Sequence, residues 1–419
     1  MIPLTGVFSK HLLEATVSYR LDQLVQPGKV GQVIGVALSG GADSLALLCL
    51  AQHWAQTQGV AIVAITVDHG LRLAAKEEAS AMMHLCRQMN IAHHTLVWEN
   101  KTTKEVTQQS ARDARYDLLG AFAIQRGLSA LLVGHQKEDQ RETFLLRLTG
   151  QSGPKGLAGM PWWRSTPWVP IIRPLLDVEP WQLKRYLMVL DLQWIEDPSN
   201  TNLRFKRVKI RKLLESDPAL RPWVDQALSV YQSNRSQQQL KTYQAYTKWS
   251  KPHPLGWCTL DIKALEQLDH VTCLDVMSEA WRMVSGNAYP PSFKQLERVL
   301  KENPKQPFTL GGCYIVPKKE GWLMARERHL IHPEPLTLQK GAVGLWDRRF
   351  RLHNQGNDTV IEKMVHAKRE QWHNEELASY LAQTLPCRGD RIIVDALGTD
   401  ALHVAFVGNT TLDWLFVSS

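Results

Sequence analysis

Apolar segments of strand length alternate with longer helical segments between residues 30 and 134, and this alternation constrains the fold more than any other feature. The strand-like runs are Val33–Leu38, Val60–Val67, Ile91–Val97 and Ala130–Val133. Repeats of strand, helix and strand form a parallel sheet covered by helices. We therefore expect an α/β fold built on a parallel sheet.

Polar motifs follow three of these four runs. They are SGGADS (Ser39–Ser44) after the first run, DHGLR (Asp68–Arg72) after the second and GHQKEDQ (Gly134–Gln140) after the fourth. Ligands of parallel sheets bind beyond the carboxyl ends of the strands. The sequence therefore predicts one functional site to which all three motifs contribute.

The composition is that of an ordinary globular protein. The chain has 419 residues, 44% of them hydrophobic and 21% charged, and its net charge of +8 permits a polyanionic partner. No apolar run is long enough to span a membrane and no secretory signal is recognisable, so we expect a soluble, cytoplasmic protein without membrane association. The six cysteines are scattered, which favours free buried thiols over structural zinc.

The sequence pattern changes twice after the predicted sheet. We expect a first domain over residues 1–215, a mainly helical, Gln-rich middle domain over 216–330 that ends in a strand–turn pattern, and a small, β-rich α+β domain over 331–419. A segment rich in Gly, Pro and Trp, Thr149–Pro170, interrupts the first domain. It is either an ordered active-site loop or a linker.

The junction Ser39–Ser44 has the composition of an anion-binding turn. A Gly-rich turn between a strand and a helix presents backbone N–H groups and the positive end of the helix dipole. Serine hydroxyls add donors, and Asp43 is suited to hold a metal ion that bridges phosphates. The alternative is a tight turn whose serine caps the helix.

This turn lacks the lysine of a Walker loop. It resembles the PP-loop of the N-type ATP pyrophosphatases. That resemblance implies ATP and Mg²⁺ as ligands, adenylation as the reaction, and AMP and pyrophosphate as products. The ATP-binding residues that it implies are Ser39, Gly40, Gly41, Ala42, Asp43 and Ser44.

Further motifs resemble those of the tRNA(Ile)-lysidine synthases, in the same order. They are VDHGLR, ARDARYDLL, GHQKEDQRETFLLRL, SGPKGLAGM, IRPLL, EDPSN and RVKIR, with a weaker likeness in GGCYIVPKKEGWLMARE. The resemblance implies that ATP and free L-lysine convert the wobble cytidine of a CAU-anticodon isoleucine tRNA to lysidine, without another protein. It also implies that the middle and C-terminal domains bind the tRNA.

His135 and Asp139 are candidate catalytic residues. If a helix begins at or before His135, the two side chains share one face beside the nucleotide. The resemblance places both in an H-x-x-x-D-Q motif, with Asp139 near the metal or the incoming amine and His135 near phosphate. Spacing alone favours an alternative in which His135 caps the helix and Asp139 pairs with Arg141 or a lysine, and the position at the end of a strand reverses that preference.

Two further pairs fall in family motifs. Arg112 and Arg115 lie three apart on a predicted helix, where guanidiniums suit a triphosphate or the lysine carboxylate; a solvated helix face is the alternative. Asp68 and His69 follow the second strand, where they contact nucleotide or lysine, or else cap a helix.

The run RFKRVKIRK holds six basic residues in nine. Such runs are often solvated faces. Because this one coincides with a family motif, we assign Arg207 and Arg211 to contact with tRNA or phosphate. The chain departs from the family pattern at Gln136, Arg141, Gln151 and Val208.

Three other functions compete with lysidine formation. tRNA thiolation generally needs cysteine pairs, which the sequence lacks, and a small-molecule amidotransferase needs an ammonia source. A nucleotide-sensing RNA-binding protein would not need both Asp43 and Asp139.

Overall fold

The computed structural model describes residues 8–25, 31–68, 74–98, 108–196, 206–287, 289–331, 334–363, 380–381, 383–388, 391–392 and 402–406. The chain forms two compact units. Unit 1 is Met1–Arg164 with Val169–Ser236, and unit 2 is Ser165–Trp168 with Gln237–Ser419. The domain boundaries expected at 215 and 330 stay predictions.

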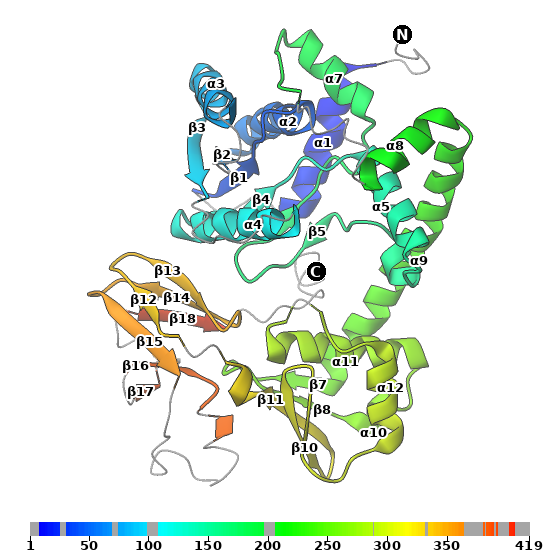
Figure 1. Ribbon diagram of the computed structural model, residues 1–419, viewed down its shortest axis with the longest axis vertical. Coiled ribbons are helices and arrows are strands. Elements are labelled where there is room, and N and C mark those ends of the chain that lie inside the picture. The colour runs from blue at the N-terminus through cyan, green and yellow to red at the C-terminus, as the bar shows by residue number, and fades with distance from the viewer. Residues whose placement is uncertain are drawn as a thin grey trace. The chain divides into compact units, whose positions relative to one another are not determined.

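Unit 1 is an α/β unit, as the alternation predicted (Figure 1). Its strands are β1 Val33–Ala37, β2 Ala61–Asp68, β3 Ala92–Val97, β4 Ala130–Leu132, β5 Trp163–Arg164 and β6 Ile171–Ile172. Its helices are α1 Lys10–Val25, α2 Ala42–Gln58, α3 Ala74–Gln88, α4 Gln108–Gln125, α5 Lys137–Thr149, α6 Pro154–Leu157, α7 Pro180–Val189, α8 Lys206–Ser216 and α9 Leu220–Trp249, the last of which continues into unit 2.

The six strands form one sheet in the order β3-β2-β1-β4-β6-β5. All neighbours are parallel except β5, which runs antiparallel to β6 at the edge. The four predicted strands are confirmed to within a residue or two at each end. The carboxyl ends of β1, β2 and β4, where the polar motifs begin, therefore lie at one edge of the sheet.

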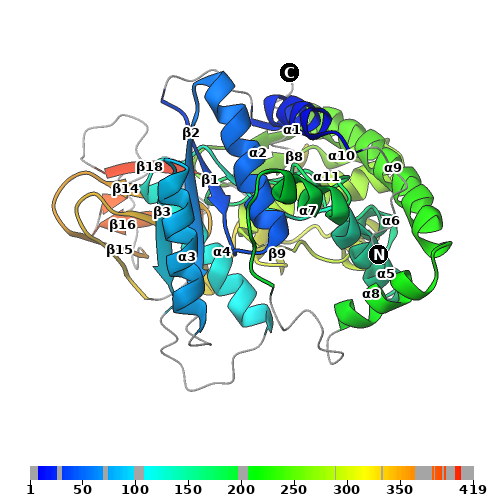
Figure 2. The same ribbon diagram turned by 90° about the horizontal axis from the view of Figure 1, so that it is seen from above.

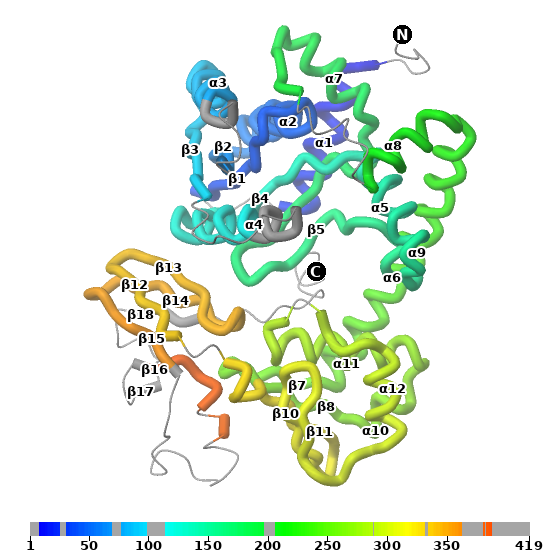
Figure 3. Tube along the Cα trace, viewed as in Figure 1, coloured from blue at the N-terminus to red at the C-terminus, as the bar shows by residue number. Residues whose placement is uncertain are grey.

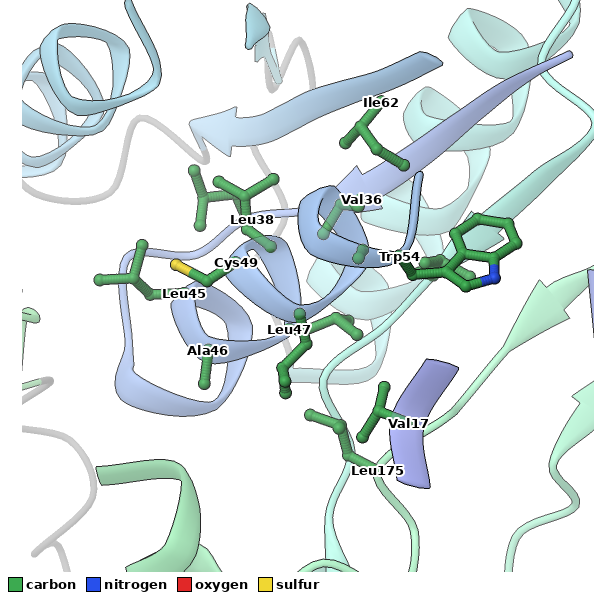
Figure 4. Packing of buried hydrophobic residues seen from close by; sticks show 14 of the residues in the cluster. Val17, Val36, Leu38, Leu45, Ala46, Leu47, Cys49, Trp54, Ile62 and Leu175 are labelled. Carbon is green, nitrogen blue, oxygen red and sulfur yellow. The ribbon is translucent and has the colours of Figure 1, made fainter. Parts of the chain in front are cut away.

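Two apolar cores cover the two faces of this sheet. Helices α1, α2, α3 and α7 contribute to one core, in which Trp54 is completely buried (Figure 4). The indole N–H of Trp54 donates to Asp22 at 2.8 Å. Helix α4 contributes Leu119 and Phe122 to the other. Burial from both sides explains the nearly continuous apolar strand sequences.

A third core joins α5 to α8 and α9, which lie side by side in Figures 2 and 3. Phe144 and Leu145 of α5 pack with Leu214 of α8 and with Val224 of α9. Because α5 begins at the carboxyl edge of the sheet, this packing holds the basic helix α8 next to the predicted site.

The described residues of unit 2 form three antiparallel sheets. The first has the order β7-β8-β11-β10-β9 and packs with α11. The strands of this sheet are β7 Ser250–Pro252, β8 Cys258–Leu260, β9 Phe308–Leu310, β10 Cys313–Lys318 and β11 Gly321–Arg326. Between β8 and β9 lie the helices α10 Ile262–Leu265, α11 His270–Ser285 and α12 Phe293–Glu302, and the 3₁₀ turn Arg328–Leu330 follows β11. The sequence pattern identified only the β10–β11 hairpin of this sheet.

The β-rich character expected after residue 331 is confirmed in the described residues. The strands are β12 Leu336–Leu338, β13 Val343–Trp346, β14 Phe350–Asn354, β15 Thr359–Lys363, β16 Pro386–Arg388, β17 Arg391–Ile392 and β18 Leu402–Phe406. They form the sheets β12-β15-β16-β17 and β13-β14-β18. Trp346, Phe350 and Leu352 lie in an apolar core of their own.

Candidate active site

The turn Ser39–Ser44 joins β1 to α2 in a conformation that depends on glycine. Gly40 has φ +83°, and a Cβ there would lie 2.7 Å from Cδ1 of Ile195. Ser44 Oγ accepts a hydrogen bond from Ser39 N at 3.1 Å and donates one to Gly41 O at 3.0 Å. The turn is therefore closed on itself across its two ends.

The capping-serine alternative is wrong for this turn. The N-cap of α2 is Gly41, which has no side chain to cap the helix. Ser39 and Ser44 instead bring their hydroxyl oxygens within 3.1 Å of each other. Hydroxyls and an uncapped helix N-terminus at the end of a parallel strand suit an anionic ligand.

Asp43 lies in the first turn of α2. Burial, and then the charge of Asp139, raise the pKa of the Asp43 carboxyl to about 7, against smaller opposing effects of Lys184, Gln136 and Arg211. Two carboxylates that repel each other at the end of a parallel sheet form a donor pair suited to a divalent cation. No group of three or more potential metal ligands occurs among the described residues, and Mg²⁺ commonly uses one or two carboxylates together with substrate phosphates.

The predicted helix begins too late for His135 and Asp139 to lie on one helix face. Helix α5 begins at Lys137 with Gln136 as the N-cap, so His135 precedes the helix. Asp139 closes a capping box in which its Oδ2 accepts a hydrogen bond from Gln136 N at 3.0 Å. The prediction that His135 and Asp139 share one helix face is therefore wrong. Both residues nevertheless follow β4, His135 in the connection and Asp139 in the first turn of α5.

The alternative interpretation, in which Asp139 pairs with Arg141, is wrong. Arg141 is 3% exposed and donates to Glu138, Glu179 and Asp225. Arg141 thus ties α5 to the residue before α7 and to α9. Asp139 lies instead 3.7 Å from the guanidinium of Arg207.

Arg207 and Arg211 of the basic run lie on the side of α8 that contacts α5. Arg207 Nη1 lies 3.7 Å from both Asp139 and Glu142, and Arg211 Nη2 lies 2.7 Å from Glu142. Glu142 is completely buried, and this burial raises its pKa despite Arg211. Arg207 and Arg211 are therefore next to the predicted catalytic carboxylate, and their contact with tRNA or phosphate stays a prediction.

The remaining predicted residues are placed only in part. Asp68 is buried as the last residue of β2. Arg112 and Arg115 both belong to α4, as predicted, and Arg115 is half-buried. His69 and the side chain of Arg112 lie outside the described residues.

Sequence reasoning missed three residues that shape the site. Ile195, which follows α7 in the chain, donates its backbone N–H to Gly40 O at 2.9 Å and so fixes the glycine turn. Glu142 anchors Arg211, and Lys184 of α7 lowers the pKa of Asp43. An isolated apolar residue such as Ile195 carries no recognisable signal, whereas Glu142 follows Asp139 at helical spacing.

All six cysteines are free and buried, as expected. Burial raises the pKa of Cys49 and Cys258 to about 12 and that of Cys86 and Cys273 to about 11. Such thiols are poor nucleophiles and metal ligands, which disfavours sulfur transfer. Within the described residues, no helix has the length and apolar character needed to cross a membrane.

Comparison with known proteins finds a family match in the N-terminal half and relatives over most of the chain. Residues 13–217 match the family described as a PP-loop domain. The chain is 31% identical to a tRNA(Ile)-lysidine synthase of Wolbachia pipientis wMel over 78% of this chain and 79% of that protein. It is 34% identical to that of Hyphomonas neptunium over 68% and 79%, and 27% identical to that of Rickettsia felis over 92% and 90%.

Proposed function

Because this chain belongs to the tRNA(Ile)-lysidine synthases, we propose that it ligates L-lysine to C2 of the wobble cytidine in isoleucine tRNA with a CAU anticodon. The PP-loop domain binds ATP, and the chain is a ligase by its family. The products proposed besides lysidine are AMP and pyrophosphate.

The observation that supports this proposal is the convergence of Asp43, Asp139 and Arg211 at the carboxyl ends of β1 and β4. The charges of Asp139 and Arg211 both act on the carboxyl of Asp43, which lies in the first turn of α2. An enzyme that transfers a nucleotide needs phosphate donors, a cation site and positive charge within reach of one another. A protein that only senses nucleotide has no need of two opposed carboxylates.

The proposed reaction has two steps. In the first, cytosine O2 attacks the α-phosphorus of ATP and the bond to pyrophosphate breaks. In the second, the ε-amine of lysine attacks C2 and loses a proton. The C2–O2 bond breaks, and O2 leaves as part of AMP. Adenylation is needed because the oxygen of cytosine is otherwise a poor leaving group.

The residues divide between these tasks. Ser39–Ser44 hold the β- and γ-phosphates, which leave as pyrophosphate, through backbone N–H groups and the two hydroxyls. Asp43 and Asp139 would hold Mg²⁺, which supplies charge neutralisation to the triphosphate. Arg207, at 3.7 Å from Asp139, supplies positive charge to the same region.

The test is incorporation of radiolabelled L-lysine into unmodified isoleucine tRNA with a CAU anticodon. We expect label that requires both ATP and the wobble cytidine, and none in a tRNA whose wobble base is uridine. Asp43→Ala is expected to abolish the label while the protein remains folded. Pyrophosphate release on RNA addition without lysine incorporation would exclude this function and retain only the adenylation step.

A further inference from the structure

Two arginines from different helices meet at one carbonyl oxygen in unit 1. Arg147 of α5 donates to Gly159 O at 3.0 Å, and Arg235 of α9 donates to the same oxygen at 2.9 Å. Arg147 also donates to Gly156 O at 2.6 Å. The two guanidiniums are thus held beside the Gly-rich turn that connects α5 to β5.

This turn is rigidly shaped rather than a linker. Gln140, which is 3% exposed, exchanges two hydrogen bonds with the backbone of Met160 at 2.9 and 2.7 Å. Gly159 has φ +67°, and a Cβ there would lie 2.6 Å from Gln140 Oε1. The direction of the Gly159 carbonyl is therefore set by the protein, and so is the meeting point of the two arginines.

The chain segments that meet here carry only positive charge. No Asp or Glu occurs between Glu142 and Asp177, where the basic residues are Arg147, Lys155, Arg164 and Arg173. None occurs between Asp225 and Asp261, where Arg235 is the first of four basic residues. In a chain with 41 acidic residues, two such stretches of more than 30 residues each are unusual, and they adjoin at Gly159.

The electrostatics of the pair agree with this charge pattern. Burial, and then the positive charge of Arg147, lower the pKa of Arg235 to about 10. Two cations brought together this way repel each other. An anion bound on the solvent side of the two guanidiniums would relieve the repulsion and accept charge-assisted hydrogen bonds from them.

We propose that Arg147 and Arg235, with the exposed Lys155 of α6, form a docking site for the phosphate backbone of the tRNA, separate from the ATP site at Ser39–Ser44. Helix α6 lies beside α9 and the end of α5 in both views (Figures 2 and 3). Phosphate contacts of this kind position an RNA without reading its bases. The proposal rests on the proposed function, because it takes tRNA as the partner.

The experiment measures tRNA binding by the full chain at several salt concentrations for Arg235→Gln and Arg235→Lys. Glutamine retains a donor for Gly159 O but removes the charge, whereas lysine retains the charge. We expect Arg235→Gln to weaken tRNA binding several-fold and to reduce the slope of log K against log salt by about 0.7 to 0.9. Arg235→Lys should keep a slope close to that of the unaltered protein.

Two further variants separate charge at this site from charge in general. Lys155→Gln changes an exposed side chain, so it is expected to reduce the slope without altering the melting temperature. Arg126→Gln, at an exposed residue in the turn between α4 and β4, removes the same charge outside the proposed docking site and should leave the slope unchanged. ATP binding without RNA should be unaffected in all four variants.

The outcomes are distinct. Equal loss of affinity in Arg235→Lys and Arg235→Gln would show that the arginine only braces the turn, and would overturn the docking site. A slope in Arg235→Gln and Lys155→Gln equal to that of Arg126→Gln would overturn it as well. Weaker ATP binding in Arg235→Gln would assign the pair to nucleotide. Failure of the unaltered protein to bind tRNA would overturn the proposed function itself.

Discussion

Gly134 lies against the backbone of Asp43: a Cβ at position 134 would be 3.0 Å from the Asp43 carbonyl oxygen and 3.1 Å from Cα of Ser44. The backbone that follows β4 and the start of α2 therefore pack directly against each other, and only glycine at position 134 leaves room for this contact. We expect Gly134→Ala to separate them, to destabilise the fold by about 1–3 kcal/mol and to weaken ATP binding. Urea denaturation and nucleotide titration measure the two effects.

Gly153→Ala is the control for that substitution. Gly153 has φ −69°, and a Cβ there would meet nothing within 4 Å. It should leave both stability and ATP binding unchanged. Equal behaviour of the two alanine variants would mean that the contact between Gly134 and Asp43 has no consequence for the nucleotide site.

The raised pKa of Asp43 makes the stability of the nucleotide-free protein depend on pH. Because the pKa rises from 3.8 to about 7 on folding, the folded state holds a proton more tightly than the unfolded state. The resulting stability is fully present below about pH 4 and is lost as pH rises through 7. Asp43→Asn, which imitates the protonated carboxyl, should exceed the unaltered protein in stability at pH 8 by up to about 4 kcal/mol.

The same measurement at pH 4 provides the control, since there the two proteins should be equally stable. The neighbouring carboxylate contributes to the effect, so Asp139→Asn should lower the pKa of Asp43. Carboxyl carbon chemical shifts followed through a pH titration report that change directly. An Asp43 pKa that does not respond to Asp139→Asn would mean that burial alone sets it.

Arg141 is the centre of a buried ion network, and its loss should be costly. It is bound to three carboxylates, of Glu138, Glu179 and Asp225, while only 3% exposed. Removing one partner of a buried pair leaves the other charges uncompensated, so Arg141→Ala should destabilise the protein by about 3–5 kcal/mol. Denaturation midpoints of the full chain check this value.

Arg221→Ala is a matched comparison, because Arg221 pairs with the same Glu138 at 2.9 Å but its side chain is 34% exposed. Removal of Arg221 leaves the buried Glu138 still paired with Arg141, so this variant should cost only about 1 kcal/mol or less. Comparable losses in both variants would contradict a special role for the buried arginine.

The sequence predicts those parts of the site that depend on local chain order. The strand before Ser39 and the helix after Asp43 have strong periodicities of their own, so the glycine turn could be placed between them. The β10–β11 hairpin was predictable for the same reason. The rest of the sheet in unit 2 was not, because its strands β7, β8 and β9 have only three residues each.

Tertiary partners explain the remaining differences. The start of α5 depends on a capping box between Gln136 and Asp139, and neither residue is among the serines and threonines that usually signal one. Arg141 pairs with the nearby Glu138, but its other two partners, Glu179 and Asp225, lie 38 and 84 residues away. The charge pattern along the sequence could suggest only a nearby carboxylate, whereas folding adds two distant ones.

The two arginines of α8 should respond differently to alanine substitution. Arg211 contacts the completely buried Glu142 at 2.7 Å, whereas Arg207, whose side chain is 42% exposed, lies 3.7 Å from its nearest carboxylates. Arg211→Ala should therefore destabilise the fold by several kcal/mol, and Glu142→Gln in the same chain should restore most of that loss. Urea denaturation of the single and double variants measures the coupling.

Arg207→Ala should instead leave stability within about 0.5 kcal/mol, because it breaks only long, partly exposed pairs. Its guanidinium is the one of the two with freedom to turn toward an anion, so the variant should weaken ATP or tRNA binding. Titration with ATP in the absence of RNA distinguishes these ligands: weaker ATP binding assigns Arg207 to the triphosphate, and a reduced salt slope for tRNA alone assigns it to RNA. If neither affinity changes, Arg207 belongs to the solvated face of the helix.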